Sequence, residues 1–251
     1  MELMQGSVNI YRDIVKAKSE KRKLFAILID PDKIKIGKID AVIALAVGAK
    51  ADCFFIGGSL IVNDVLDEAI AIIKASCNIP VILFPGSSRQ LSYKADALLF
   101  LSLISGRNAD LLIGKHVESA PFLKISPLEI ISTGYMLIDG GVPTSVSYMS
   151  NTYPIPDSKD DIAVCTAIAG EMLGLKLIYM DAGSGALNPV SGSMIEAVSG
   201  AIEIPLIIGG GISSPELARK AVISGADIVV VGNAIEKDPK LIAELSAAIH
   251  D

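Results

Sequence analysis

The sequence predicts a single α/β domain over residues 1–251, folded as a (β/α)8 barrel, the TIM-barrel architecture. Short apolar runs bounded by turn residues alternate along the chain with segments of helical length and spacing. Runs that are apolar throughout, rather than at every second position, are typical of parallel strands buried on both faces. The 251 residues contain eight such runs, and eight parallel strands with intervening helices define a closed barrel.

The elements in the first half of the chain end at clear turn signals. The first expected strand stops at Asp30-Pro31 and the second at Gly57-Gly58, dipeptides that favour turns over continued strand. Apolar residues then recur at the spacing of an amphipathic helix. In order, we expect helix 7–23, strand 24–30, helix 38–48, strand 52–59, helix 65–77, strand 80–85 and strand 97–103.

The segment between the third and fourth strands departs from this alternation. Residues 87–95 are too few and too polar for a full helix, so we expect a short helix or a loop there. A barrel wall that lacks its helix would leave a gap that suits an apolar substrate tail.

The second half of the chain returns to the alternation after one irregular stretch. Residues 142–159 carry three prolines and follow a strand, which places them on the catalytic face of a barrel as either a tolerated insertion or a substrate cover. The next helix starts at Asp160 and ends at Gly174, both typical of caps. We expect helix 110–123, strand 129–138, helix 160–174, strand 176–181, helix 193–201, strand 205–208, helix 215–225, strand 227–231 and helix 239–250.

The composition and the first turn exclude two other classes of protein. The chain is 51% hydrophobic with a mean hydropathy of +0.53, which suggests a membrane protein. However, no stretch approaches the ~18–20 apolar residues of a membrane span, so we expect no transmembrane segment. The first strand is followed by Asp30-Pro31-Asp32-Lys33, where a dinucleotide-binding fold would need a Gly-x-Gly-x-x-Gly turn.

The charged and metal-ligating residues restrict the chemistry further. The formal net charge is −6, with no basic block, so we expect no nucleic-acid partner. The odd set Cys53, Cys77 and Cys165, without a secretory leader, favours the cytoplasm, and we expect buried thiols. Since His116 and His250 are too few and too far apart for a zinc cluster, catalysis must depend on carboxylates, hydroxyls, backbone amides and a hard metal ion.

Glycine-rich segments follow the seventh and eighth expected strands. These are Gly209-Gly210-Gly211 and Gly232-Asn233. Glycines let backbone N–H groups approach an anion closely, and the N-terminus of the following helix favours negative charge. In barrels of this class, the loops after strands seven and eight commonly bind phosphate. The two glycine-rich segments therefore predict a phosphate-bearing ligand. The alternative is that the glycines only form tight turns between strand and helix.

The end of the sixth strand combines a phenol with a carboxylate. Strand alternation puts Tyr179 and Asp181 on the same side of the strand. Near a phosphate site, this pair suits a polyol, because a carboxylate accepts hydroxyl hydrogens and can take a proton. The alternative is a polar plug above the core. The segment reads Tyr179-Met180-Asp181-Ala182-Gly183-Ser184-Gly185, and its serine and glycines could donate to the phosphate.

The first two strands end in oxygen-bearing side chains. Asp30 and Ser59 stand at neighbouring strand tips, and hard oxygen ligands suit Mg²⁺, which takes one or two protein groups and fills its other positions with water and substrate phosphates. The alternative is that both residues cap local turns or helices. Lys33, Arg89 and Arg107 follow strands one, three and four and are candidate partners for a diphosphate, or else ordinary surface charge.

Six motifs, in order from the first strand to the eighth, resemble those of the geranylgeranylglyceryl phosphate synthase family, in its larger archaeal and Bacteroidetes-type group. Each motif is short, but the ordered set is specific. The motifs are Leu28-Ile29-Asp30-Pro31-Asp32, Ile56-Gly57-Gly58-Ser59, Ile82-Leu83-Phe84-Pro85-Gly86, the segment from Tyr179 to Gly185, Ile208-Gly209-Gly210-Gly211-Ile212 and Val231-Gly232-Asn233.

The resemblance implies a Mg²⁺-dependent prenyltransferase that joins sn-glycerol 1-phosphate to geranylgeranyl diphosphate, as a dimer or higher homo-oligomer. It implies Asp30 and Ser59 as metal ligands, and Asp30 and Asp181 as the catalytic residues. Two positions depart from the family pattern: Leu28 stands where some relatives carry Lys, and Asp181 where Glu is more common. The glycerol phosphate site implied is Tyr179, Met180, Asp181, Ala182, Gly183, Ser184, Gly185, Gly210, Gly211, Gly232 and Asn233.

Other functions remain open at this level. A barrel enzyme acting on another sugar or polyol phosphate would share the phosphate site, although a Schiff-base aldolase needs a lysine inside the barrel and Lys176 stands at the wrong end of its strand. A non-catalytic barrel that binds glycerol phosphate or isoprenoid, and a structural subunit, are further alternatives. A relative with another prenyl chain length is also compatible with the motifs.

Overall fold

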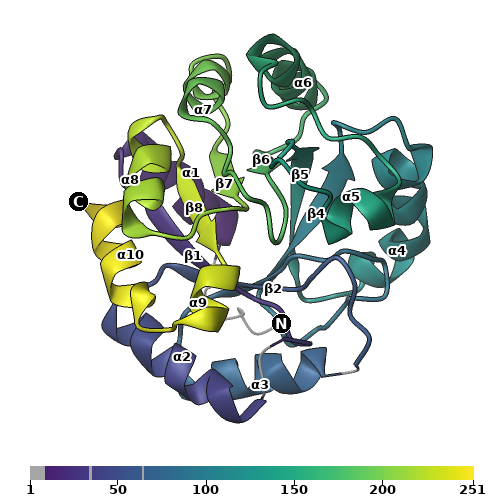
Figure 1. The fold of residues 1–251 in the computed structure, drawn as a ribbon. Helices are drawn as coiled ribbons and strands as arrows, with labels where there is room; N and C mark the ends of the chain where they lie inside the picture. The colour runs from purple at the N-terminus through teal and green to yellow at the C-terminus, as the bar shows by residue number, and fades with distance from the viewer. Residues whose placement is uncertain (1–8, 34–35, 64) are drawn as a thin grey trace.

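The computed structural model describes residues 9–33, 36–63 and 65–251. Eight parallel strands close into a barrel in chain order, which confirms the predicted fold (Figure 1). Neighbouring strands pair in parallel all the way round, including the closing pair β1 and β8. The strands are β1 Leu24–Ile29, β2 Cys53–Ile56, β3 Val81–Leu83, β4 Ala97–Leu103, β5 Glu129–Leu137, β6 Leu177–Asp181, β7 Leu206–Gly209 and β8 Ile228–Val231.

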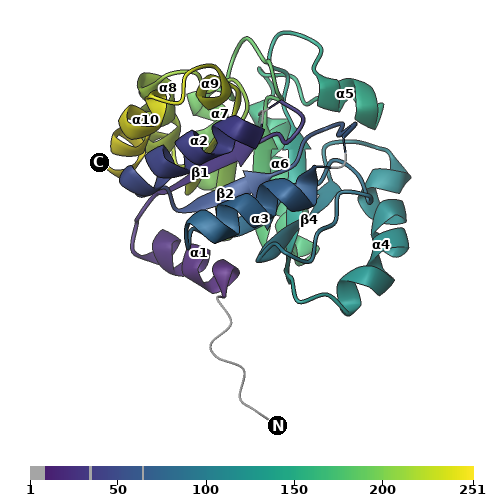
Figure 2. The same ribbon diagram turned by 90° about the horizontal axis from the view of Figure 1, so that it is seen from below.

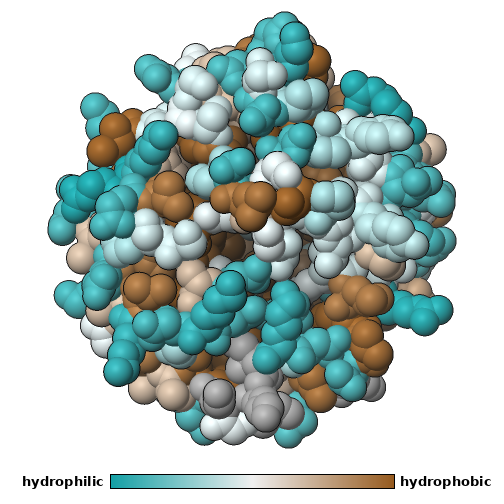
Figure 3. Space-filling view, in the orientation of Figure 1, coloured by the Kyte–Doolittle hydropathy of each residue, from teal (hydrophilic) through white to brown (hydrophobic). Residues whose placement is uncertain are grey.

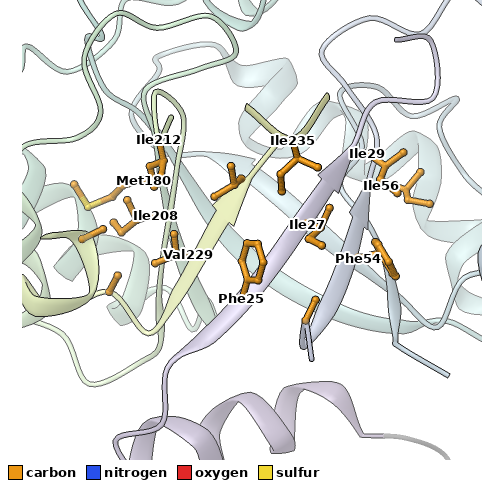
Figure 4. Packing of buried hydrophobic residues seen from close by; sticks show 14 of the residues in the cluster. Phe25, Ile27, Ile29, Phe54, Ile56, Met180, Ile208, Ile212, Val229 and Ile235 are labelled. Atoms are coloured by element: carbon orange, nitrogen blue, oxygen red, sulfur yellow. The ribbon is translucent and has the colours of Figure 1, made fainter. Parts of the chain in front are cut away.

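Alternating side chains divide the buried residues between two cores. One set, with Phe55, Leu99 and Tyr179, fills the barrel interior. The other set, with Phe25 and Met180, packs between the strands and the surrounding helices (Figure 4). Burial on both faces explains why each strand reads as a continuous apolar run and why the chain is so hydrophobic.

The helices surround the barrel with one interruption. Residues 84–96, between β3 and β4, contain no helix, so the predicted alternative of a loop is correct there. The first two residues of the predicted helix 7–23 lie outside the described residues. The helices are α1 Ile10–Ser19, α2 Ile36–Gly48, α3 Leu66–Ser76, η1 Asp110–Gly114, α4 Lys115–Lys124, α5 Ser145–Ser150, α6 Asp160–Met172, α7 Gly192–Ser199, α8 Pro215–Ile223, α9 Asn233–Lys237 and α10 Leu241–His250.

Two short helices at the barrel mouth differ from the sequence prediction. The stretch 142–159 contains α5, where the Thr144 side chain and Ser147 form a reciprocal capping box. Asn233 begins α9 directly after β8. Each helix is about one to two turns long, too short for a hydrophobic period to show in the sequence.

Helix α1 covers the opposite end of the barrel from α5 and α9 (Figure 2). Its first backbone N–H groups, at Ile10 and Tyr11, donate to the Glu129 carboxylate at 2.6 and 3.1 Å. The Lys176 ammonium lies over the Tyr11 ring, 5.1 Å from its centroid. Lys176 is therefore at the end away from the mouth, as the sequence predicts, and cannot serve a Schiff base there.

The prediction of buried thiols is only partly correct, whereas the prediction of no transmembrane helix agrees with the described residues. Cys53 is buried and Cys77 partly so, but Cys165 is exposed on α6, so the prediction of three buried thiols is wrong for Cys165. Among the described residues, no helix has the length and hydropathy required to cross a membrane.

Candidate active site

Asp181 is a buried carboxylate at the mouth end of β6, only 7% exposed. The Tyr135 hydroxyl donates to its Oδ2 at 2.6 Å and the Gly183 backbone N–H to its Oδ1 at 2.7 Å. Burial raises the pKa of the Asp181 carboxyl above its ordinary value, and these two hydrogen bonds lower it in part. A carboxylate held this way, with lone pairs still free, can accept a proton from a substrate hydroxyl.

Aromatic rings support this carboxylate from within the barrel. The Tyr179 ring stacks on Phe84 with centroids 5.0 Å apart and meets Tyr135 edge-on at 5.5 Å. Burial raises the pKa of both tyrosines well above the ordinary value, as does the Asp181 charge. Both phenols therefore stay protonated at neutral pH, so Tyr135 remains a donor to Asp181.

The side chains of Met180 and Ala182 point away from the mouth. Both belong to the outer core, where Met180 packs near Ile208 and Ile212 (Figure 4). Of these two predicted substrate-binding residues, only the backbone can face a ligand. Tyr179 and Asp181 do share the inner side, as strand alternation predicts.

Three loops bring the predicted phosphate-binding residues together at one side of the mouth. The Ser184 hydroxyl, after β6, donates to Asn233 Oδ1, after β8, at 3.1 Å. Among the described residues, the backbone N–H groups of Ser184, Gly185 and Gly211 donate to no protein acceptor. Gly210 approaches the same loop so closely that a Cβ on it would lie 2.5 Å from the Gly183 nitrogen. Free N–H groups, a hydroxyl and an amide on one rim suit a phosphate group.

Asp30 directly follows β1, and Ser59 lies three residues beyond the end of the neighbouring strand β2. Asp30 is 8% exposed, and its carboxylate lies against Gly58, where a Cβ would be 3.1 Å from Oδ2. The Lys33 ammonium is 3.0 Å from the same Oδ2, so this oxygen already attracts a cation. Among the described residues, no three His, Cys, Asp or Glu side chains gather as a metal cage. One carboxylate and one hydroxyl after neighbouring strands suit Mg²⁺, which binds few protein groups.

Gln90 fixes the position of Ser59 and was not singled out in the sequence. Its side chain accepts from the Gly86 N–H and donates to the Gly58 carbonyl, both at 2.9 Å. It thereby joins the loop after β3 to the tip of β2. No sequence signal identifies this role, because it depends on how the loop 84–96 folds back.

Replacing Gln90 by Met should lower the free energy of unfolding by about 1–2 kcal/mol, because it leaves a donor and an acceptor at the strand tips without partners. Urea denaturation measures this loss, and hydrogen exchange at the Gly86 amide should become faster. Ser87→Ala, at an exposed position of the same loop, is the control and should change stability by less than about 0.5 kcal/mol. Equal stability of both variants would contradict the bridging role.

Two further residues at the candidate site were missed in the sequence. Tyr135 points into the barrel from β5 and is paired with Tyr179 on β6. The alternation of side chains along β5 could therefore have identified it. The Glu236 carboxylate, on α9, lies near Lys33 and Asp30. Burial raises its pKa, which the Lys33 charge lowers in part. Nothing in the sequence predicts Glu236, because α9 itself was not expected.

The remaining candidates have different surroundings. Arg107 is exposed, and its guanidinium donates to carbonyls of its own loop, including that of Gly106 at 3.1 Å. Arg89 is exposed as well. The stretch 142–159 packs against the β6 loop at Thr144, close to Gly183, while Tyr148 and Tyr153 are 85% and 93% exposed.

A closed parallel barrel with glycine-rich loops and free N–H groups after strands six to eight has the features of the phosphate-binding (β/α)8-barrel proteins. The model of the PcrB family matches residues 14–249. The chain therefore belongs to the PcrB family.

Relatives that carry the name geranylgeranylglyceryl phosphate synthase cover nearly the whole chain. The geranylgeranylglyceryl phosphate synthase of Chitinophaga pinensis is 56% identical over 241 residues, 96% of either chain. That of Thermococcus kodakarensis is 40% identical over 94% of this chain and 92% of its own. The crystal structure of (S)-3-O-geranylgeranylglyceryl phosphate synthase from Thermoplasma acidophilum, in complex with its substrate sn-glycerol-1-phosphate, superposes with a TM-score of 0.91 at 31% identity, over 96% of this chain and 98% of that one.

Proposed function

We propose that the protein is a prenyltransferase that joins sn-glycerol 1-phosphate to geranylgeranyl diphosphate, giving 3-O-(geranylgeranyl)glyceryl phosphate and diphosphate. The observation that carries the proposal is the buried Asp181 carboxylate, held by Tyr135 and Gly183 beside a rim of free N–H groups. This arrangement suits a phosphorylated polyol with a hydroxyl to deprotonate. The near full-length similarity to geranylgeranylglyceryl phosphate synthases supports the same substrates.

The residues of the site divide the reaction between them. The rim at Ser184, Gly211 and Asn233 binds the phosphate of glycerol phosphate and places its 3-hydroxyl near Asp181. The hydroxyl oxygen attacks the first carbon of the prenyl chain, whose bond to the diphosphate breaks, and the electron pair leaves with the diphosphate. Asp181 accepts the hydroxyl proton. The aromatic floor formed by Phe84 and the two tyrosines excludes water from the reacting carbon.

Asp30 and Ser59 are proposed to hold Mg²⁺. When bound there, the ion would neutralise the charge of the leaving diphosphate. The neighbouring Lys33 ammonium adds positive charge to the same side of the mouth.

Metal removal tests this assignment. Chelation should abolish product formation, and added Mg²⁺ should restore it. Asp30→Asn should raise the Mg²⁺ concentration for half-maximal activity by more than about tenfold, because a neutral amide binds the ion poorly. Asp157→Asn, at an exposed carboxylate, is the control for a general loss of charge. Full activity in chelator would exclude the metal role.

The prenyl chain needs an apolar surface near the mouth. The wall at β3 and β4 lacks a helix, and the neighbouring η1 and α4 expose Ile113, Val117 and Phe122. On the mouth face, hydrophobic residues lie in small groups among hydrophilic ones (Figure 3). We propose that the chain lies over the helix-free wall. Its preferred length depends on where this surface ends.

Transfer of radiolabel from glycerol 1-phosphate to a lipid-extractable product tests the function. The assay compares geranyl, farnesyl, geranylgeranyl and heptaprenyl diphosphates with the purified protein and Mg²⁺. The greatest kcat/KM is expected with geranylgeranyl diphosphate. A preference for another chain length would correct the prenyl substrate alone. Binding of glycerol phosphate without turnover would point instead to a non-catalytic barrel, and turnover of a sugar phosphate to another barrel enzyme.

The exposed apolar residues are also consistent with a homo-oligomer. Met172 and Leu173 at the end of α6, and Ile223 at the end of α8, are largely exposed. We propose that two or more copies bury part of this surface. Light scattering measures the mass in solution, and a monomer at micromolar concentration would contradict the proposal.

A further inference from the structure

Lys33 joins the two halves of the mouth with one side chain. Its ammonium lies 3.0 Å from Asp30 Oδ2, on the side proposed for the diphosphate. It also donates to the Ser184 hydroxyl at 3.2 Å, on the side proposed for the glycerol phosphate. Ser184 in turn donates to Asn233 Oδ1 at 3.1 Å. The ammonium is therefore within reach of both sites at once.

The surroundings of Lys33 are acidic and leave it free to bind more. Two carboxylates, those of Asp30 and Glu236, lie near this ammonium. An ammonium has three N–H donors, and the contacts with Asp30 and Ser184 use two of them. The side chain remains 47% exposed, so the third donor can meet one phosphate oxygen arriving from solvent, and the donor that now meets the Ser184 hydroxyl can turn to a second.

Two anionic substrates must bind side by side in this mouth. Glycerol phosphate and a prenyl diphosphate both carry several negative charges, and at short distance such charges repel one another. A cation fixed between them lowers this repulsion and donates charge-assisted hydrogen bonds to both. Lys33 occupies that place between the two half-sites.

We propose that Lys33 is a shared phosphate ligand that binds both the phosphate of glycerol 1-phosphate and the diphosphate. The inference rests on the proposed function and extends it. It predicts coupling: each anion binds better in the presence of the other than it would without Lys33. By thermodynamic linkage, the coupling factor is the same in both directions.

Calorimetry on the intact protein tests the shared role. Dissociation constants are measured for sn-glycerol 1-phosphate and for inorganic pyrophosphate with Mg²⁺, each alone and with the other anion saturating. Lys33→Met should weaken each anion about tenfold or more when alone. It should weaken each further when the other is bound, a change that loss of local structure would not produce. Lys33→Arg keeps the charge and should bind within about threefold of the wild type.

Further variants show whether a weaker affinity comes from the lost Lys33 contacts, from the change in net charge or from impaired folding. Lys240→Met removes an exposed lysine and should leave both dissociation constants within about twofold. Lys33→Gln serves as a second truncation, and circular dichroism verifies that each variant folds.

Three results would overturn the proposal. Lys33→Met could bind both anions as the wild type does, could lose only one of them, or could keep the wild-type coupling between them. Failure of the wild-type protein to bind glycerol 1-phosphate or to form product would instead contradict the proposed function, so the two failures are distinguishable.

Discussion

Replacing Asp181 by Asn is expected to lower kcat by about 100- to 10,000-fold, the range for loss of a general base, while it stabilises the folded protein at neutral pH. The amide cannot accept the glycerol hydroxyl proton, so activity falls. The same substitution removes a buried negative charge. Burial of that charge is unfavourable, because desolvation is the largest cause of the raised pKa of the Asp181 carboxyl. A loss of activity joined to a gain in stability is typical of residues placed for chemistry rather than for packing.

The gain in stability should depend on pH with a defined sign. Burial raises the pKa of Asp181 above its ordinary value of 3.8, so the folded state holds this proton more tightly than the unfolded state. Wild-type stability from this group is fully present below the unfolded pKa and is lost as the pH rises through the folded pKa. The Asn variant has no such loss. Its advantage should therefore be absent below about pH 4 and grow above it.

Urea denaturation of both proteins between pH 4 and 8, together with kcat for the variant, measures both effects. Asp181→Glu keeps a carboxylate on a longer arm and should retain activity within about tenfold, which separates the charge from the exact reach. Wild-type turnover by the Asn variant would exclude Asp181 as the proton acceptor. Lower stability at pH 7 would show that its hydrogen bonds with Tyr135 and Gly183 outweigh the cost of burial.

The position of the site follows from features that the sequence carries. Apolar runs locate the strands, and in a parallel barrel every strand delivers its C-terminal residues to the same rim. Asp30, Ser59, Asp181, Gly210 and Asn233 could therefore be assigned to one mouth without knowledge of the packing. Strand parity also placed Tyr179 and Asp181 together.

The supporting residues could not be predicted in the same way. Gln90 depends on the path of the loop after β3, and Glu236 depends on a helix of five residues that has no visible period. The contact between Tyr135 and Asp181 requires the β5–β6 register, which closure of the barrel determines. The alternation of side chains along β6 also distinguishes Met180 from Asp181. The family motif includes both residues, but only the Asp181 side chain can face the mouth.

Gly210→Ala is expected to cost about 2–5 kcal/mol of folding free energy and to abolish tight binding of glycerol phosphate. Gly210 has a φ of +78°, where a residue with a Cβ is strained by about 1–2 kcal/mol. Its Cβ would also collide with the Asp181 carboxylate and lie 2.5 Å from the Gly183 nitrogen and 2.6 Å from that of Ala182. Relief of such overpacking displaces neighbours at a further cost of about 1–3 kcal/mol, and the neighbours here are the carboxylate and the loop that bind substrate.

Gly185→Ala separates backbone strain from collision. Gly185 has a similar φ of +86°, but a Cβ there meets nothing within 4 Å, so only the strain of about 1–2 kcal/mol should appear. Urea denaturation gives the stability of both variants, and calorimetry gives their affinity for glycerol 1-phosphate. The difference between them isolates the close approach of the β7 loop to Asp181. If both variants lost the same stability and Gly210→Ala still bound glycerol phosphate normally, that approach would have no part in shaping the site.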